Sequence, residues 1–241
     1  MRKLLLAGIA TISVLAGALA AIAGQGVMTP ARAATAVCYG SGAYTGSNPI
    51  GGGPGYVSPH GYSQAAADYV VTTAAGLKSA LAAAGSGDVV WVPGSAVIDI
   101  SGQSGSLTVP AGVALASDRG TDGSPGGLIK SGSRGGVIFK RKSNSVVSGL
   151  RFQGTNSAGS AWVLQSSGSL HTEVENCELA NGGGGGVGFS DDNIPWNSDW
   201  VTGADQKHHW VHHCCRHGFS QRGMGYGGWV VASGVLIEGN V

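Results

Sequence analysis

Short apolar runs broken by glycine, serine and asparagine recur in the second half of the chain, and one pattern returns four times. Each copy begins with a β-branched residue and carries Gly, Asn or His two positions later. The copies are Val147–Phe152, Val174–Leu179, Val211–Arg216 and Ile237–Val241, and they start 27, 37 and 26 residues apart. The Gly-, Asp- and Asn-rich segment 181–205 lengthens the middle step. Such a period, built from short strands, is typical of a solenoid of stacked β-coils, because one coil cannot bury its apolar side alone.

The preceding part of the chain predicts one helix and then a series of strands. Residues Ala74–Ala84 carry Leu77 and Leu81 four apart among alanines, which is the spacing of a short amphipathic helix. The expected strands are short and end at turn-forming residues. They are Asp88–Val92, Ala96–Ile100, Leu107–Val109, Val113–Ala116, Gly127–Lys130, Val137–Lys140, Val146–Phe152, Ala161–Gln165 and Thr172–Leu179. A two-sheet sandwich has similar strands, but the returning copies favour an all-β parallel β-helix (solenoid) whose open end the helix caps.

Glycine is abundant and charge is scarce. Gly accounts for 44 of the 241 residues, charged residues make up 11%, and the formal net charge is +1. Globular domains usually have about 25% charged residues and ~7% Gly, so we expect many tight turns and a surface rich in hydroxyl and amide groups. The small net charge gives no electrostatic argument for binding nucleic acid or an anionic membrane.

The first 33 residues have the pattern of a secretory signal peptide. Arg2 and Lys3 precede an apolar run, Leu4–Ala23, and Ala31–Ala33 matches a small-residue cleavage site. An uncleaved membrane anchor is the alternative, because about twenty apolar residues nearly span a bilayer. We expect a secreted, extracellular protein without membrane contact after cleavage. Its parts would be a signal peptide (1–33), a Gly/Ser/Pro-rich segment of irregular structure or linker (34–70) and a β-helix domain (71–241).

The chain has four cysteines, which allow three complete pairings in an oxidising compartment. The repeat register places Cys177 and Cys214 at the same position of successive copies, where their Cα atoms would be about 4.8 Å apart, within the range of a disulfide. This predicts a Cys177–Cys214 disulfide and leaves Cys38 to join Cys215. The alternative is that the stacked cysteines are small buried hydrophobic side chains.

Several motifs resemble those of one protein family. They are Asp88–Gly94, Ile98–Ile100, Leu107–Gly112, Ala116–Gly120, Gly123–Gly126, His212–Gly218 and Gly223–Gly227. Through them, residues 70–241 resemble secreted right-handed parallel β-helix proteins of the pectate-lyase-like superfamily, including bacterial members whose function is often unassigned. The resemblance implies the fold and leaves the activity open, because the superfamily includes lyases, hydrolases, esterases and non-catalytic proteins. Its members usually continue for more coils, so we expect either that this chain is truncated at its C-terminus or that something outside this sequence covers its last coil.

Glu175, His212 and Glu238 occupy one column of the repeat register. Their side chains point opposite to the flanking Val or Ile, so we expect them to face solvent. Carboxylates on both sides of an imidazole would raise its pKa and favour acid–base catalysis near neutral pH. The alternative is a surface ladder of ion pairs that fixes the register of the coils.

A second group of candidates is Asp191 and Asp192, followed by His217 and Arg222. The group resembles the paired Asp and the His-Gly element of polygalacturonases, whose carboxylates act as acid and as base on water. The sequence departs from that family in its first Asp motif and its Arg-Ile-Lys element, and a solvated loop is the alternative for Asp191 and Asp192. Pectate lyases instead use calcium held by carboxylates and an Arg or Lys base, for which Arg216 and Arg222 are the candidates.

Five aromatic residues lie close to these candidates in the sequence, Trp196, Trp200, Trp210, Tyr226 and Trp229, and Trp196, Trp200 and Tyr226 are the candidates for substrate binding. A sugar ring has an apolar face that packs on aromatic side chains, so we expect these residues to bind substrate. Core packing is the alternative, which Trp196 and Trp200 escape best because they lie in a polar insertion. We expect the segment 188–205 to form one wall of a groove along the stack.

These patterns predict a secreted monomer that acts on extracellular polysaccharide. A pectate- or uronate-type lyase with calcium as cofactor is favoured over a polygalacturonase-like hydrolase. A non-catalytic carbohydrate-binding or cell-surface protein is the alternative, in which the His and Glu residues are structural. The candidate catalytic residues are Asp191, Asp192, His212, Arg216, His217 and Arg222.

Overall fold

The computed structural model describes the chain between residues 51 and 238, with gaps. The described residues are 51–53, 56–103, 105–132, 139–154, 162–167, 169–182, 185–190, 209–217 and 235–238. Within them the protein has three parallel β-sheets, the α-helix α2 (Ala74–Ala83), and two short 3₁₀ helices, Gln64–Ala66 and Thr121–Gly123. This agrees with the predicted mainly β class built from parallel strands. In this part of the chain, no helix has the length and apolar character needed to cross a membrane.

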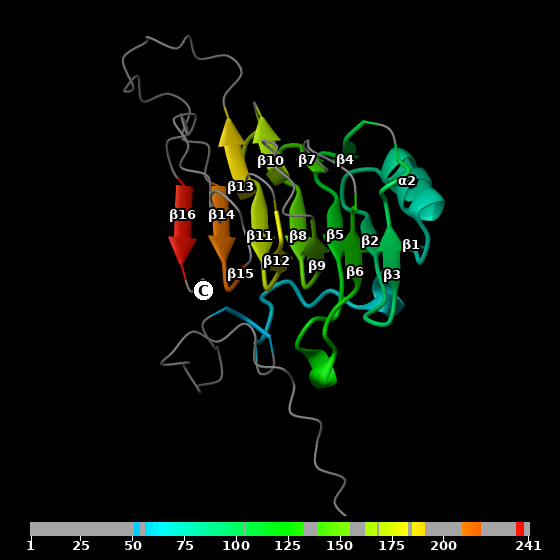
Figure 1. Ribbon diagram of the computed structural model, residues 1–241, viewed down its shortest axis with the longest axis horizontal. Helices are drawn as coiled ribbons and strands as arrows, with labels where there is room; N and C mark the ends of the chain where they lie inside the picture. The colour runs from blue at the N-terminus through cyan, green and yellow to red at the C-terminus, as the bar shows by residue number, and fades with distance from the viewer. Residues whose placement is uncertain are drawn as a thin grey trace, which may run out of the picture. The chain divides into compact units, whose positions relative to one another are not determined.

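The strands of each sheet are short and lie in parallel register (Figure 1). Sheet A has, in spatial order, β1 (Tyr69–Val70), β2 (Val89–Trp91), β5 (Ala114–Ala116), β8 (Val146–Ser148), β11 (Glu173–Glu175), β14 (His209–His212) and β16 (Val235–Glu238). Sheet B has β3 (Val97–Asp99), β6 (Leu128–Lys130), β9 (Arg151–Gln153), β12 (Glu178–Ala180) and β15 (Cys215–His217). Sheet C has β4 (Leu107–Val109), β7 (Phe139–Arg141), β10 (Trp162–Ser167) and β13 (Gly185–Ser190). From β2 to β15 the chain visits sheets A, B and C in turn.

The predicted register of the returning copies is confirmed in sheet A. Val174 of β11 pairs with Val147 of β8 on one side and with Val211 of β14 on the other, and Val211 pairs with Ile237 of β16. The side chains of Val147, Val174 and Val211 have no exposed surface. This valine column forms part of one continuous apolar core, which gives the repeat its β-branched first position.

The turn from sheet A into sheet B has a left-handed residue at the same place each time. Gly149, Asn176 and His213 directly follow β8, β11 and β14 and have φ angles of 66°, 47° and 50°. Gly adopts this backbone at no cost, and Asn and His adopt it more often than most residues. The Gly, Asn or His of the repeat is therefore a corner residue. For the same reason the single strands predicted at Val146–Phe152 and Thr172–Leu179 are wrong, because each is split into two.

Helix α2 (Ala74–Ala83) confirms the predicted amphipathic helix, with its end shifted by one residue. Thr73 caps its N-terminus, because the Thr73 hydroxyl accepts a hydrogen bond from the Gly76 N–H at 3.1 Å. Leu77 and Leu81 are buried in the core against β2 and β4, and β4 is the edge strand of sheet C. The helix therefore packs beside β2 of sheet A and against the β4 edge of sheet C.

Part of the segment expected as a polar insertion is a strand. β13 lies in the Gly-rich region after Asn181 and pairs with β10 over five residue pairs, including Leu164 with Val187. Val187 is 1% exposed, so this segment contributes to the core. The expected groove wall at 188–205 begins within this strand, and it stays a prediction because residues 191–205 lie outside the described residues.

Cys177 and Cys214 lie at equivalent positions in the core and are fully buried. They are thiols and are not joined in a disulfide. Each Sγ is turned toward the backbone of the preceding strand: Cys177 Sγ donates to the Val147 carbonyl and Cys214 Sγ to the Val174 carbonyl, both at 3.6 Å. The predicted Cys177–Cys214 disulfide is therefore wrong, and the alternative of small buried side chains is confirmed. Cys38 lies outside the described residues, so its pairing with Cys215 stays a prediction.

Residues 51–53 and 56–62, which we call the strap, pack against sheet A. The strap is the blue to cyan segment that passes below the strands in Figure 1. Gly53 N donates to Asn176 Oδ1 at 2.8 Å, and the same oxygen accepts from Arg119 Nη1 at 2.7 Å. Asn176 in turn donates to the Arg119 carbonyl at 2.6 Å. The strap has irregular structure, as predicted, but it is bonded to a corner of the sheets and is not a loose linker.

Candidate functional site

The outward column of sheet A contains the predicted residues in the predicted register, but it does not face solvent. Glu175 pairs with His212, and His212 pairs with Glu238. Glu175 is 0% exposed and His212 is 1% exposed, because the strap covers them. The expected solvent-facing orientation is therefore wrong for both residues. The alternative of an ion-pair ladder at the surface is also wrong for Glu175 and His212, because both are buried. The side chain of Glu238 lies outside the described part of the structure.

Glu175 is buried as a carboxylate that accepts three hydrogen bonds from hydroxyl groups. Ser58 and Ser148 donate to Oε1, each at 2.6 Å, and Tyr56 donates to Oε2 at 2.8 Å. Burial, with the neighbouring Glu175 carboxylate, raises the pKa of Tyr56 far above its ordinary value, so this hydroxyl stays a donor. A buried carboxylate is costly unless its oxygens are satisfied. The strap supplies two of the three donors.

His212 has neighbours at both ring nitrogens. Its Nε2 lies 2.8 Å from Glu173 Oε1, and its Nδ1 lies 3.0 Å from His213 Nδ1. Trp210, two residues earlier on β14, stacks on the imidazole with ring centroids 3.7 Å apart. A buried ring held on both edges and one face is well positioned, but a polymer reaches it only if the strap moves.

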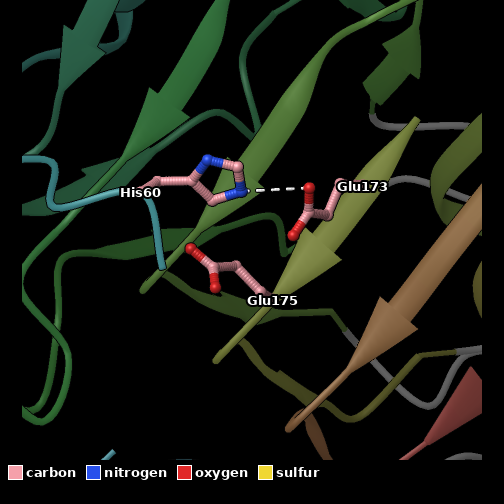
Figure 2. Close-up of side chains that lie close together, drawn as sticks. All are labelled: His60, Glu173 and Glu175. Atoms are coloured by element: carbon pink, nitrogen blue, oxygen red, sulfur yellow. Dashed lines mark ion pairs between the residues drawn. The ribbon is translucent and has the colours of Figure 1, made fainter. Parts of the chain in front are cut away.

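Glu173 lies between two imidazoles, one from β14 and one from the strap. Its Oε2 is 3.0 Å from His60 Nε2, and Figure 2 shows the two side chains meeting across the gap between strap and β11. Burial alone would raise the pKa of Glu173, but the hydrogen bonds from His212 and His60 lower it to about 2. The hydrogen bond to Glu173 raises the pKa of His60 despite partial burial. The contact is therefore strongest as an imidazolium–carboxylate pair.

We call Tyr56, Ser58, His60, Glu173, Glu175 and His212 the strap cluster. Within it, His60, Glu173 and Glu175 offer one nitrogen and two carboxylate oxygens that all lie within 4.8 Å of one another. This cluster could hold a metal ion. The sequence pattern indicated Glu175 and His212 alone. The alternation of Glu173 with Glu175 was an available signal for Glu173, whereas nothing periodic marks His60 in a Gly-rich segment.

A second His–Glu pair lies on the outward face of sheet B. His217 Nε2 is 3.0 Å from Glu178 Oε1, and the side chains are 35% and 24% exposed. Leu179, between Glu178 and Ala180 on β12, points into the core and has no exposed surface, so its neighbour Glu178 points outward. His217 is therefore the predicted catalytic residue that the structure places at the surface.

Arg216 continues an inward column of sheet B. Leu179 pairs with Arg216 on one side and with Phe152 on the other. Burial lowers the pKa of the Arg216 guanidinium, and within the described part of the chain its Nε and Nη1 atoms have no hydrogen-bond partner. A base that removes a proton from a polysaccharide must meet it at the surface, so this placement does not favour Arg216 in that role.

The other predicted site residues cannot be placed. Asp191, Asp192, Trp196, Trp200, Arg222 and Tyr226 lie outside the described residues. Their expected roles in catalysis and in substrate binding stay predictions.

Comparison with known proteins adds no relative. No protein-family model, no curated protein and no solved structure matches this chain. The resemblance to the pectate-lyase-like superfamily therefore stays a prediction that rests on the sequence motifs.

Proposed function

We propose that this chain is a secreted parallel β-helix protein that acts on extracellular polysaccharide, with His217 as its acid–base group and Glu178 as the residue that orients it. The fold proposal is supported by the order in which the chain visits sheets A, B and C and by the parallel pairing of every neighbouring strand pair. The sandwich considered as the alternative is built from antiparallel sheets. The right hand follows from the strong preference of parallel β-strand connections, and secretion from the signal pattern in residues 1–33.

The observation that carries the function is the partly exposed His217–Glu178 pair on the outward face of sheet B. A polysaccharide is too large to enter a buried site, so its acid or base must lie at the surface. With Nε2 donating to the Glu178 carboxylate, the Nδ1 atom is the one that exchanges a proton with substrate. In a lyase that proton comes from the carbon α to a uronate carboxylate. In a hydrolase it goes to the glycosidic oxygen.

Calcium belongs to the lyase form of this proposal. Calcium takes six to eight oxygen ligands, usually with several carboxylates. The strap cluster supplies two carboxylates and an imidazole, so it does not fit calcium well. A calcium site would therefore use carboxylates such as Asp191 and Asp192, outside the described residues.

A non-catalytic binding protein is the second candidate, and the strap cluster favours it. The two hydroxyl donors of the strap on Glu175 and the ion pair between His60 and Glu173 are the contacts that a structural lock between strap and sheet requires. In that case the His–Glu pairs fix the register of the strands and take no part in chemistry.

One assay separates these candidates. The purified protein is incubated with polygalacturonate and with a panel of neutral polysaccharides, with and without calcium, and unsaturated ends and reducing ends are followed together. His217→Ala is compared with His171→Ala, a matched control at an exposed histidine 3.2 Å from Asn144 Oδ1. We expect unsaturated ends from the wild type and from His171→Ala, and at least about a 100-fold loss in His217→Ala.

Each other result has a defined meaning. Reducing ends without unsaturation would favour hydrolysis over elimination. Full activity of His217→Ala would refute the assignment of the acid–base group. Binding to a polymer without new ends of either kind would favour the non-catalytic candidate.

A further inference from the structure

We propose that His60, Glu173 and Glu175 bind one divalent transition-metal ion of the zinc class, which ties the strap to sheet A. The ligand set is one imidazole nitrogen and two carboxylate oxygens (Figure 2). The metal site does not depend on the proposed action on polysaccharide, because it uses neither His217 nor Glu178.

The distances in the cluster suit a small cation. Zinc binds imidazole and carboxylate atoms at about 2.0–2.2 Å in tetrahedral geometry, which puts two ligand atoms roughly 3.3–3.5 Å apart. His60 Nε2 and Glu173 Oε2 are already 3.0 Å apart, and all three ligand atoms lie within 4.8 Å of one another. The Glu175 oxygen therefore has to move by at most about 1.5 Å to reach this geometry.

The charges in the cluster favour a cation. Glu173 and Glu175 place two carboxylates within a few ångströms, with side-chain exposures of 14% for Glu173 and a fully buried Glu175. In the described part of the chain, the hydrogen-bond and ion-pair partners of these two side chains are imidazoles and hydroxyl groups. Two carboxylates removed from water need compensating positive charge. A divalent ion supplies it at the point where both carboxylates converge, and it replaces the proton that His60 Nε2 shares with Glu173, which is released to solvent on binding.

The oxygen atoms are also oriented by a second layer of hydrogen bonds. Glu173 Oε1 is held by His212 Nε2 at 2.8 Å, which leaves Oε2 directed at His60. Ser58, Ser148 and Tyr56 fix the plane of the Glu175 carboxylate. Metal-binding carboxylates in proteins are usually fixed by such partners, which also tune affinity.

The ligand types select the zinc class over calcium and magnesium. An imidazole suits zinc and similar transition metals, whereas calcium and magnesium prefer sites made of oxygen ligands. Three protein ligands leave a fourth position for water. The side chain of His60 is 29% exposed and that of Glu173 is 14% exposed, so two of the three ligands are in contact with solvent.

The bound ion would hold the strap against sheet A. His60 and Glu173 are joined across 113 positions of the chain, and their present link is a single contact of 3.0 Å. An ion that binds only when the strap is packed on sheet A stabilises this packed state by mass action. The strap then stays over Glu175 and His212 in the presence of zinc and is released more easily without it.

The test uses the purified protein without a polyhistidine tag, because a tag would bind the same ions. Metals are removed with EDTA and by dialysis, and zinc chloride and calcium chloride are titrated by calorimetry. Cobalt(II) absorption gives an independent readout of imidazole coordination, and thermal unfolding with and without zinc gives the stabilisation. The variants are His60→Ala and Glu173→Gln, with His171→Ala as the exposed-histidine control.

We expect one zinc ion per chain, at least 100-fold weaker binding of calcium, and an increase in Tm on adding zinc. His60→Ala should weaken zinc binding by more than the roughly 10–100-fold that loss of a second-layer partner costs, and should remove the increase in Tm. If Glu173→Gln fails to fold, His60→Ala decides alone, because His60 contributes one ion pair and a ring stacked on Tyr62. The proposal is overturned if the wild type binds no zinc, if His60→Ala binds as tightly as the wild type, or if calcium binds as tightly as zinc.

Discussion

Tyr56→Phe tests how strongly the strap is held to sheet A. The change removes one hydroxyl and keeps the ring, which lies 4.7 Å from the His213 ring by centroid distance. It leaves Glu175 Oε2, on a carboxylate with 0% exposure, without its 2.8 Å donor. A hydrogen bond to a charged group contributes about 1.5–3 kcal/mol, and a buried acceptor left without a donor costs a similar amount. We therefore expect Tyr56→Phe to lower the free energy of unfolding by about 1.5–3 kcal/mol, a large part of the roughly 5–15 kcal/mol that holds a typical domain folded.

The assay is equilibrium urea unfolding at pH 7 in EDTA, so that any bound metal is removed from the comparison. Tryptophan fluorescence is a suitable probe, because Trp210 stacks on His212 next to the strap. Tyr62→Phe is the matched control. Tyr62 stacks on the His60 ring at 5.1 Å, a contact that does not use its hydroxyl. We expect that control to change stability by less than about 0.5 kcal/mol. Equal midpoints and slopes for the two variants would refute the reasoning, since Glu175 would then not depend on the Tyr56 hydroxyl.

Three further predictions concern the corner at Gly149, the carboxylate of Glu173 and the thiols of Cys177 and Cys214. Gly149→Ala should lower the free energy of unfolding by more than Gly105→Ala, because a Cβ at Gly149 would collide with the Ser117 carbonyl, whereas Gly105 has open space at a similar φ of 72°. The control isolates the roughly 1–2 kcal/mol cost of left-handed backbone, and equal losses in urea unfolding would contradict the collision. The pKa of Glu173 falls from 4.5 to about 2 in the folded protein. The ionised Glu173 carboxylate therefore stabilises the folded protein fully above pH 4.5, and this contribution to the free energy of unfolding is lost as pH falls toward 2. Glu173→Gln should flatten this part of the stability curve in urea unfolding at pH 2 to 5, and a wild-type slope in the variant would assign the effect to other groups. Cys177 and Cys214 should react with a thiol reagent only after denaturation, and no prior reduction should be needed. Fast reaction of the native protein would contradict their burial. Peptide mapping without reduction tests the predicted Cys38–Cys215 disulfide.

The register of sheet A could be predicted from the sequence because two local requirements mark each copy. The inward position at Val147, Val174 and Val211 needs a β-branched residue that packs in the core. The corner two residues later needs left-handed backbone, which restricts it to residues such as Gly149 and Asn176. Both requirements act within three residues, so they are visible in the sequence without knowledge of the fold.

The environment of the site could not be predicted in the same way. Alternation along β11 and β14 correctly separates Glu175 and His212 from the core valines, but it does not reveal whether another segment covers the outward face. Here the cover comes from Tyr56 and Ser58, which are 119 and 117 residues away from Glu175 in the chain. Their surroundings are rich in Gly, Ser and Pro, and such a composition indicates irregular structure without saying where it packs.

The two His–Glu pairs show how this cover changes the surroundings of the same pair of residue types. His212 with Glu173 and His217 with Glu178 are chemically the same pair, at 2.8 Å and 3.0 Å, and both point outward from a parallel sheet. The first pair is 2% and 14% exposed under the strap, and the second is 35% and 24% exposed. An imidazole that is covered and bonded at both ring nitrogens has a structural role, whereas a partly exposed imidazole is accessible for proton exchange. Displacing residues 56–62 would expose the first pair to solvent, but the ring nitrogens of His212 would keep their contacts with Glu173 of β11 and with His213, which do not belong to the strap. Burial by the strap therefore separates the two pairs, and it is the reason why the proposed acid–base role is given to His217 and not to His212.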